Sequence, residues 1–192
     1  MISLPKLFTA ALAATSVVIA AATPQQVSDG LKSLTQKAQA LQAPAQSISI
    51  VNAPLILIGQ GPFPQIIAGY SDIISTGNAL AEQIGAESRM VRRRQVTRGA
   101  ADDLVFDAYK EFVRVNQDLL NILIGKAGLV EQIPLVGQPI AAVLRSFEGT
   151  ADTISTALIN TFVARANDFT SEANSLGGTL TIAIEKYGSL PL

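Results

Sequence analysis

The chain contains no cysteine and no histidine. The absence of cysteine excludes a disulfide framework, so the fold has to be held together by packing alone. The absence of both residues also excludes Ser-His and Cys-His nucleophiles, imidazole acid-base catalysis and most zinc sites. We therefore predict a protein that is not an enzyme and that needs no cofactor and no metal.

Charged and aromatic residues are scarce as well. Charged residues make up 15% of the chain, the formal net charge is -1, and aromatic residues make up 5%. This balance offers little attraction to nucleic acid, which is not an expected partner. Hydrophobic residues nevertheless reach 48%, so the interior is built mainly from Leu, Ile, Val and Ala. Such an interior suits either a plain helical core or a pliable apolar cavity.

Residues 1–22 have the pattern of a secretory signal peptide. Lys6 supplies the positive charge, residues 7–19 form an uncharged and mostly apolar run, and residues 20–22 are the small residues expected before a cleavage site. The run is too short to span a bilayer, which takes about 20 apolar residues. We therefore expect no transmembrane segment and a secreted domain of residues 23–192, extracellular or in the cell wall. A retained N-terminal anchor is the alternative.

The apolar residues after residue 22 recur with a period near 3.5, and no strand pattern competes. This pattern predicts an all-α fold, an antiparallel bundle of about five helices. Thr23 can cap the first helix, with Pro24 at its first position. A second, short helical pattern is expected after Pro44, through residues 48–51.

The next helix is expected to begin near Pro62 or Pro64 and to continue past Gly77, which weakens it without ending it. It then gives way to a basic segment, residues 89–98, which contains five arginines. We interpret this segment as a solvated linker. The alternative is a basic spot for anionic headgroups, polysaccharide phosphates or a processing protease.

A further helix is predicted from about Ala101 to Ile124, and Gly125 and Gly128 are expected to begin the connection that follows it. From Pro139 the helical pattern resumes through Phe162. It then continues over residues 169–187, which we treat as a separate final helix.

Paired carboxylates are the remaining route to catalysis, because glycosidase chemistry needs only two of them. Glu148 and Asp152 lie one helical turn apart, which places their Cβ atoms about 5 to 6 Å apart on one face. Both would then point the same way instead of flanking a substrate. We favour a structural pair beside the core, with Arg145 or Lys126 as partner.

Two connections carry more apolar residues than loops usually do. Either they pack over the ends of the core, or they contact apolar material outside the protein. As candidates for adsorption to surfaces they contain Leu55, Ile56, Leu57, Ile58, Leu129, Val130, Ile133, Leu135 and Val136.

The apolar faces of the longer helices are wider than a two-residue seam, and wide faces can enclose an acyl chain between helices. The polar end of such a chain could be held by a hydroxyl of Tyr70, Ser71 or Ser75. A filled core is the alternative. The candidate lipid-binding residues are Ile66, Ile67, Tyr70, Ile74, Phe112, Leu119, Leu120, Leu123, Leu144, Phe147, Ile154 and Leu158.

Three stretches also carry a family resemblance. They are FVRVNQDLLNILIGKAGL at residues 112–129, LRSFEGTAD at residues 144–152 and GPFPQIIAGYSDI at residues 61–73. With these stretches the chain resembles the fungal hydrophobic surface-binding protein A family, which is related to the cell wall galactomannoproteins. The resemblance implies a secreted helical domain that adsorbs to hydrophobic surfaces, where it recruits a polyester-degrading hydrolase, or that encloses fatty acids between its helices.

Galactomannoproteins often carry a Ser/Thr-rich tail and a lipid-anchor signal, whereas this chain stops at Leu192, just after Tyr187. This difference favours a free secreted protein, or one held in the wall by sugars, with cell wall polysaccharide as a further partner. The alternative function is that of a structural or antigenic cell wall mannoprotein with a filled helical core.

Overall fold

The computed structural model describes residues 22–49, 60–91, 99–130 and 136–190. These residues form five α-helices and one short 3-10 helix, and none of them lies in a strand. The predicted all-α bundle is therefore confirmed. The helices are α1 (Pro24–Gln46), α3 (Pro62–Val91), α4 (Ala100–Val130), α5 (Gly137–Thr161) and α6 (Ala166–Gly188), with η2 (Val163–Arg165) before α6.

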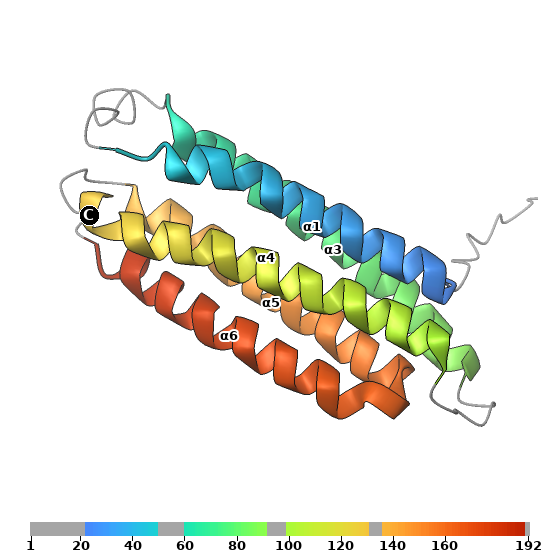
Figure 1. Ribbon diagram of the computed structural model, residues 1–192. Coiled ribbons are helices and arrows are strands. Elements are labelled where there is room, and N and C mark those ends of the chain that lie inside the picture. The colour runs from blue at the N-terminus through green and yellow to red at the C-terminus, as the bar shows by residue number, and fades with distance from the viewer. Residues whose placement is uncertain (1–21, 50–59, 92–98, 131–135, 191–192) are drawn as a thin grey trace, which may run out of the picture.

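The five helices lie in two layers (Figure 1). In the view shown, α1, α4 and α6 form the front layer, and α3 and α5 lie behind them. Consecutive helices run in opposite directions, so the three front helices point one way and the two rear helices the other. Neighbours within a layer are therefore parallel. Antiparallel neighbours meet at the two edges of the bundle, where α1 packs on α3 and α5 packs on α6.

Small residues allow close approach at both edges. Gly30 of α1 faces Leu80 of α3, and a methyl group at Gly30 would come within 2.6 Å of Leu80 Cδ1. At the opposite edge, a methyl group at Gly137 would come within 2.6 Å of the carbonyl oxygen of Tyr187. A methyl group at Gly30 would displace only the end of the Leu80 side chain, whereas one at Gly137 would meet a backbone atom, so the space requires glycine at Gly137.

Helix α4 is the middle helix of the front layer. Its backbone lies close to those of α1 and α6, whereas long side chains bridge it to the rear layer. The hydroxyl groups of Tyr109 and Ser155 lie 2.6 Å apart, and the rings of Phe112 and Phe147 have centroids 6.4 Å apart. Side chains of α4 thus reach across to α5 in the rear layer.

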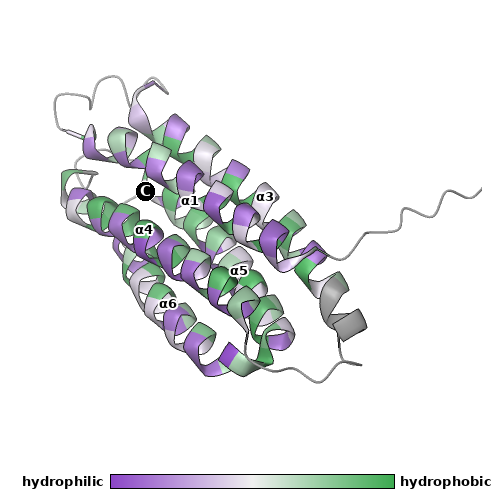
Figure 2. Ribbon diagram, turned by 45° about the vertical axis from the view of Figure 1, so that its right-hand side comes forward, coloured by the Kyte–Doolittle hydropathy of each residue, from purple (hydrophilic) through white to green (hydrophobic). Residues whose placement is uncertain are grey.

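Each helix turns hydrophobic residues toward its neighbours and hydrophilic residues outward (Figure 2). The buried apolar side chains of the described residues form one continuous cluster that includes residues of all five helices. Burial of this shared face, at about 25 cal/mol per Å² of apolar area, is the main source of stability in a chain without cysteine.

The start of α1 agrees with the prediction, and its end does not. The side-chain oxygen of Thr23 accepts a hydrogen bond from the backbone N–H of Gln26, whose side chain in turn accepts one from the backbone N–H of Thr23. Pro44 does not end the helix, because it lies in the last turn, where its missing N–H costs a single hydrogen bond. The short helix expected after it is absent up to Ser49, and residues 50–51 lie outside the described residues.

Helix α3 begins at Pro62, as predicted, after Gly61, whose φ of 97° is the left-handed conformation that glycine tolerates. It passes through Gly77 without a break. It then continues as far as Val91, so Arg89 is helical and the predicted linker begins later than expected. The other four arginines of the basic segment lie outside the described residues.

Helix α4 is longer than predicted. It begins at Ala100 and includes Gly125 and Gly128, which do not mark a loop. Each glycine weakens a helix by about 1 kcal/mol, a cost that tertiary packing can offset. Ala127, between the two glycines, is buried in the core, and its packing keeps this last part of α4 helical.

The last two helices are separate, as predicted. Helix α5 ends at Thr161, and Phe162 follows it with a non-helical backbone and a buried side chain. The turn η2 then leads into α6. Arg165 at this corner packs on the ring of Phe106, with its Cζ 4.7 Å from the ring centroid, and pairs with Asp103 at the start of α4.

Candidate functional site

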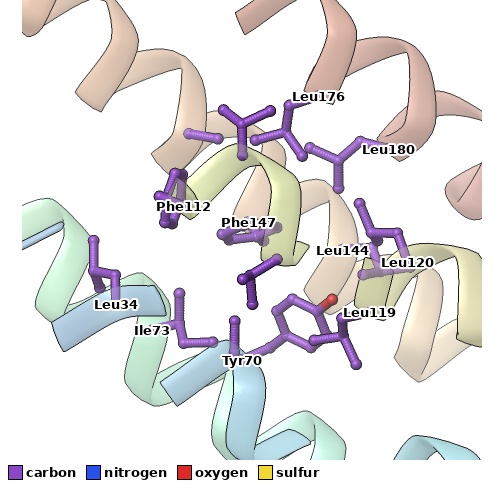
Figure 3. Packing of buried hydrophobic residues seen from close by; sticks show 14 of the residues in the cluster. Leu34, Tyr70, Ile73, Phe112, Leu119, Leu120, Leu144, Phe147, Leu176 and Leu180 are labelled. Carbon is purple, nitrogen blue, oxygen red and sulfur yellow. The ribbon is translucent and has the colours of Figure 1, made fainter. Parts of the chain in front are cut away.

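The space between the two layers is filled by large apolar side chains, which we call the interlayer core. Figure 3 shows its centre. The ring of Tyr70 on α3 lies 5.2 Å, centroid to centroid, from that of Phe147 on α5, which in turn contacts Phe112 on α4. The interlayer core comprises the buried residues labelled there, namely Leu34, Tyr70, Ile73, Phe112, Leu119, Leu120, Leu144, Phe147, Leu176 and Leu180.

All twelve candidate lipid-binding residues belong to one hydrophobic cluster. Ile67 and Ile74 are half-buried and pack against it. The other ten are fully buried, at 0% exposure. The structure therefore brings together, from α3, α4 and α5, side chains that are up to 92 positions apart in the sequence, from Ile66 to Leu158. The buried residues are Ile66, Tyr70, Phe112, Leu119, Leu120, Leu123, Leu144, Phe147, Ile154 and Leu158.

Of the three hydroxyls considered for holding a polar ligand end, the one that lies inside is Tyr70. Its hydroxyl group is fully buried, has no hydrogen-bond partner among the described residues and points toward Leu119 and Leu144 (Figure 3). Ser71 and Ser75 are exposed on the outer side of α3. The Ser71 hydroxyl donates a hydrogen bond to the carbonyl of Ile67, 2.8 Å away.

Burial keeps the phenol of Tyr70 neutral. Desolvation raises its pKa far above the usual value of a tyrosine, and the neighbouring phenol of Tyr187 adds to the increase. Burial also raises the pKa of Tyr187, whose hydroxyl donates a hydrogen bond to the carbonyl of Leu123 at 2.9 Å. The pKa of Tyr109 is raised to about 12, chiefly by desolvation. All three phenols are therefore neutral hydrogen-bonding groups at ordinary pH.

Asn116 is a second polar group inside the core. It is fully buried on α4, one turn after Phe112 and one turn before Leu119 and Leu120. Its side-chain nitrogen donates to the carbonyl of Phe112 at 2.8 Å, while its Oδ1 accepts no hydrogen bond from a described residue. Asn116 is absent from the predicted site residues, although its place on the apolar face of α4 is visible in the sequence.

The core contains no charge among the described residues. Its buried polar side chains are those of Ser, Thr and Asn, and no Asp, Glu, Lys or Arg is among them. The unpaired polar atoms of the fully buried residues are thus neutral donors and acceptors; a carboxylate oxygen of the half-buried Asp102, near the start of α4, is also unpaired among the described residues. The remaining buried hydroxyl without a partner is that of Ser28 on α1.

The second predicted site, the surface-adsorbing connections, is only partly described. Leu129 and Val130 belong to helix α4 and not to a loop, which corrects the prediction, and Leu129 is half-buried. Val136 precedes α5 and is half-buried against the core. The remaining predicted residues, Leu55, Ile56, Leu57, Ile58, Ile133 and Leu135, lie outside the described residues.

The helix ends that these connections join lie together at one end of the bundle. This end holds the C-terminal ends of α1 and α4 and the N-terminal ends of α3 and α5 (Figure 1). Two apolar connections far apart in the sequence are therefore attached to the same end.

The carboxylate pair does not form a cleft with the candidate site. Glu148 is half-buried and Asp152 is exposed, both on the outer part of α5. In the described residues, no group of three or more acidic side chains is placed to hold a metal ion. None of the described helices is long and apolar enough to cross a membrane.

Comparison with known proteins yields no match to a family, to a curated protein or to a solved structure. The function has to be argued from the residues and their geometry.

Proposed function

We propose that this chain is a secreted, non-enzymatic protein that binds fatty acids or related lipids and hydrophobic surfaces. The observation that carries the proposal is the pair of unpaired polar atoms, Tyr70 Oη and Asn116 Oδ1, in a core that is mostly apolar and holds no buried charged side chain among the described residues. More than 90% of buried polar groups in folded proteins are paired, and each one left unpaired costs about 1 to 3 kcal/mol. A ligand with a polar end would supply the missing partner.

The apolar lining suits the rest of such a ligand. Each CH₂ group that moves from water into an apolar interior contributes about 0.8 kcal/mol. The lining from α3, α4 and α5 is aliphatic and aromatic along the bundle axis, which suits an acyl chain that lies parallel to the helices.

Entry of a ligand requires helices to part, and the seam between α1 and α4 is one candidate, although these two helices pack closely. Hydrogen bonds or ion pairs link α4 to α6 through Gln117 and Ser175, α5 to α6 through Gln138 and Gly188, and α1 to α3 through Lys37. In the described residues, we find none between α1 and α4. Separation of α1 from α4 would therefore break apolar contacts and leave the polar links intact.

The same architecture supports adsorption to a surface. Amphipathic helices without disulfides can turn their apolar faces toward an apolar phase when a seam opens. The two apolar connections are attached at one end of the bundle, where they would make the first contact. The family resemblance supports this reading and extends it to recruitment of a secreted hydrolase on a polyester surface, or to a place in the cell wall.

The test is mass spectrometry of an organic extract of the purified protein, followed by displacement of the neutral dye Nile red by long-chain lipids. We expect co-purified lipid and a displaceable dye. The absence of both would contradict lipid binding.

The alternative is a structural cell wall protein with a permanently filled core. The aromatic contacts between Tyr70, Phe112 and Phe147 favour it, because they already fill the centre of the interlayer core. On this alternative, neither lipid nor dye is bound. The weaker enzymatic hypothesis predicts an activity on glycans or esters that is lost in Glu148→Gln, and we expect no such activity.

A further inference from the structure

We propose that the interlayer core selects ligands whose polar end is uncharged, such as a long-chain alcohol, and discriminates against ionised fatty acids. This inference rests on the proposed lipid binding and specifies the chemistry of the ligand. It follows from the groups that the core offers to a polar end and from the groups that it lacks.

The groups on offer are neutral. Tyr70 presents a phenol hydroxyl, which can donate one hydrogen bond, and Asn116 presents an amide oxygen, which can accept one. The two side chains are connected through two phenylalanines of the core. Tyr70 contacts Phe147, Phe147 contacts Phe112, and the carbonyl of Phe112 accepts the hydrogen bond from Asn116.

The core lacks the cation or the set of several donors that a buried carboxylate would need. A buried anion is stable when it is paired with a cation or bound by several donors. No Lys or Arg is buried in the described residues. Within the same residues, the buried hydroxyls without a partner are those of Tyr70 and of Ser28 on α1, and both are neutral donors. The side-chain nitrogen of Asn116 is already engaged with Phe112.

An alcohol can pair with either of the two free groups. Its oxygen accepts a hydrogen bond from a phenol, and its hydroxyl donates one to an amide oxygen. An undissociated carboxylic acid can do the same through its carbonyl and its hydroxyl. A fatty acid therefore enters this core only in its protonated form, so the affinity falls about tenfold for each pH unit above its pKa.

The buried titratable side chains of the described residues are tyrosines, whose raised pKa values keep them protonated between pH 6 and pH 8. The group that faces Tyr70 is the phenol of Tyr187 on α6, and Tyr109 on α4 is the other buried titratable side chain; Asp152 and Glu172 act on Tyr109 from outside the core. The buried residues of α1 and α5 include no titratable side chain. A pH dependence of binding between pH 6 and pH 8 thus belongs to the ligand.

The experiment compares decan-1-ol, decanoic acid and decane as competitors of Nile red at pH 6 and pH 8. We expect the affinity for decan-1-ol to be the same at pH 6 and pH 8, and likewise that for decane. The affinity for decanoic acid should fall about 100-fold from pH 6 to pH 8. Tyr70→Phe should lower the affinity for decan-1-ol about three- to tenfold, the worth of one hydrogen bond, and leave decane unchanged. Tyr187→Phe, which removes a hydroxyl that already has a partner, is the matched control.

The outcomes separate the two proposals. Decanoate that competes as well as decan-1-ol at pH 8 would overturn the selectivity and leave lipid binding intact. An unchanged preference for decan-1-ol over decane in Tyr70→Phe would remove Tyr70 from the site. Failure of all three competitors at both pH values would overturn lipid binding, and the selectivity with it.

Discussion

Tyr70 and Tyr187 are neighbours in the same core, and their hydroxyl groups differ in one respect. That of Tyr187 donates a hydrogen bond to the carbonyl of Leu123, whereas that of Tyr70 has no partner among the described residues. A protein core usually pairs such groups. The hydroxyl of Tyr187 thus contributes to stability, whereas that of Tyr70 is the group that the proposed ligand would pair.

This difference is measurable without a ligand. Tyr70→Phe removes an unpaired buried hydroxyl and should raise the free energy of unfolding by about 1 kcal/mol, while Tyr187→Phe should lower it by about 1 kcal/mol. Urea unfolding followed by circular dichroism would measure both. Equal losses in the two variants would show that the Tyr70 hydroxyl has a partner in solution.

The close packing of α5 against α6 predicts a contrast between two glycines of α5. Gly137→Ala places a methyl group 2.6 Å from the backbone oxygen of Tyr187, which cannot move independently, and should destabilise the fold by about 1 to 3 kcal/mol. At Gly149 nothing lies within 4 Å of such a methyl group, and alanine should stabilise the helix by about 0.5 to 1 kcal/mol. Thermal unfolding of both variants would measure this contrast; similar midpoints would contradict the close approach.

The capping box of α1 gives a third prediction. Thr23→Ala removes the acceptor for the N–H of Gln26 and should lower the free energy of unfolding by about 0.5 to 2 kcal/mol. Thr153 is an exposed threonine inside α5 whose hydroxyl bonds only to its own helix, at Gly149. Thr153→Ala is therefore the control and should not destabilise the protein.

The buried tyrosines predict a loss of stability at high pH. The pKa of Tyr109 is raised from 10.0 to about 12 in the folded state, and those of Tyr70 and Tyr187 are raised further. Their contribution is complete below pH 10, where the unfolded chain also holds these protons. Above pH 10 the unfolded chain releases them first, so stability falls by up to about 1.4 kcal/mol per pH unit for each tyrosine. Tyrosinate absorbance should appear together with unfolding, and ionisation near pH 10 without unfolding would contradict this.

Adsorption should depend on one end of the bundle. Replacing Leu57 and Val136 with Asp should release the protein from hydrophobic beads, because both lie in or beside the apolar connections attached to that end. Val163→Asp is the control, since Val163 is 60% exposed at the opposite end. Circular dichroism would establish that the variants remain folded. Retention of the double variant would show that these connections are not the contact surface.

Much of the fold could be predicted from local patterns. The cap at Thr23, the start of α3 at Pro62 and the separation of α5 from α6 follow from rules that act within a few residues. The errors lie where packing outweighs these rules. Pro44, Gly125 and Gly128 are helix breakers by propensity, and each lies within a helix here.

The candidate site, too, could be predicted from the sequence only in part. Helical periodicity places Tyr70 on an apolar face together with Ile66 and Ile73, and this alone made Tyr70 a candidate. It does not reveal that the hydroxyl of Tyr70 is unpaired, because the partner of a buried group comes from other helices. The same periodicity places Asn116 on an apolar face of α4 but does not reveal that its Oδ1 is unpaired.

The sequence by itself determined the all-α class, the five long helices of the described residues, their apolar faces and the absence of thiol and imidazole chemistry, because these depend on residue types and their spacing. Only the tertiary structure decided that α1, α4 and α6 form one layer over α3 and α5, with parallel neighbours in each layer. The physical reason is that similar aliphatic faces can pair in many ways. Side-chain size selects among these pairings, with close contacts at glycines such as Gly30 and Gly137 and wide spacing where Tyr70, Phe112 and Phe147 lie between the layers.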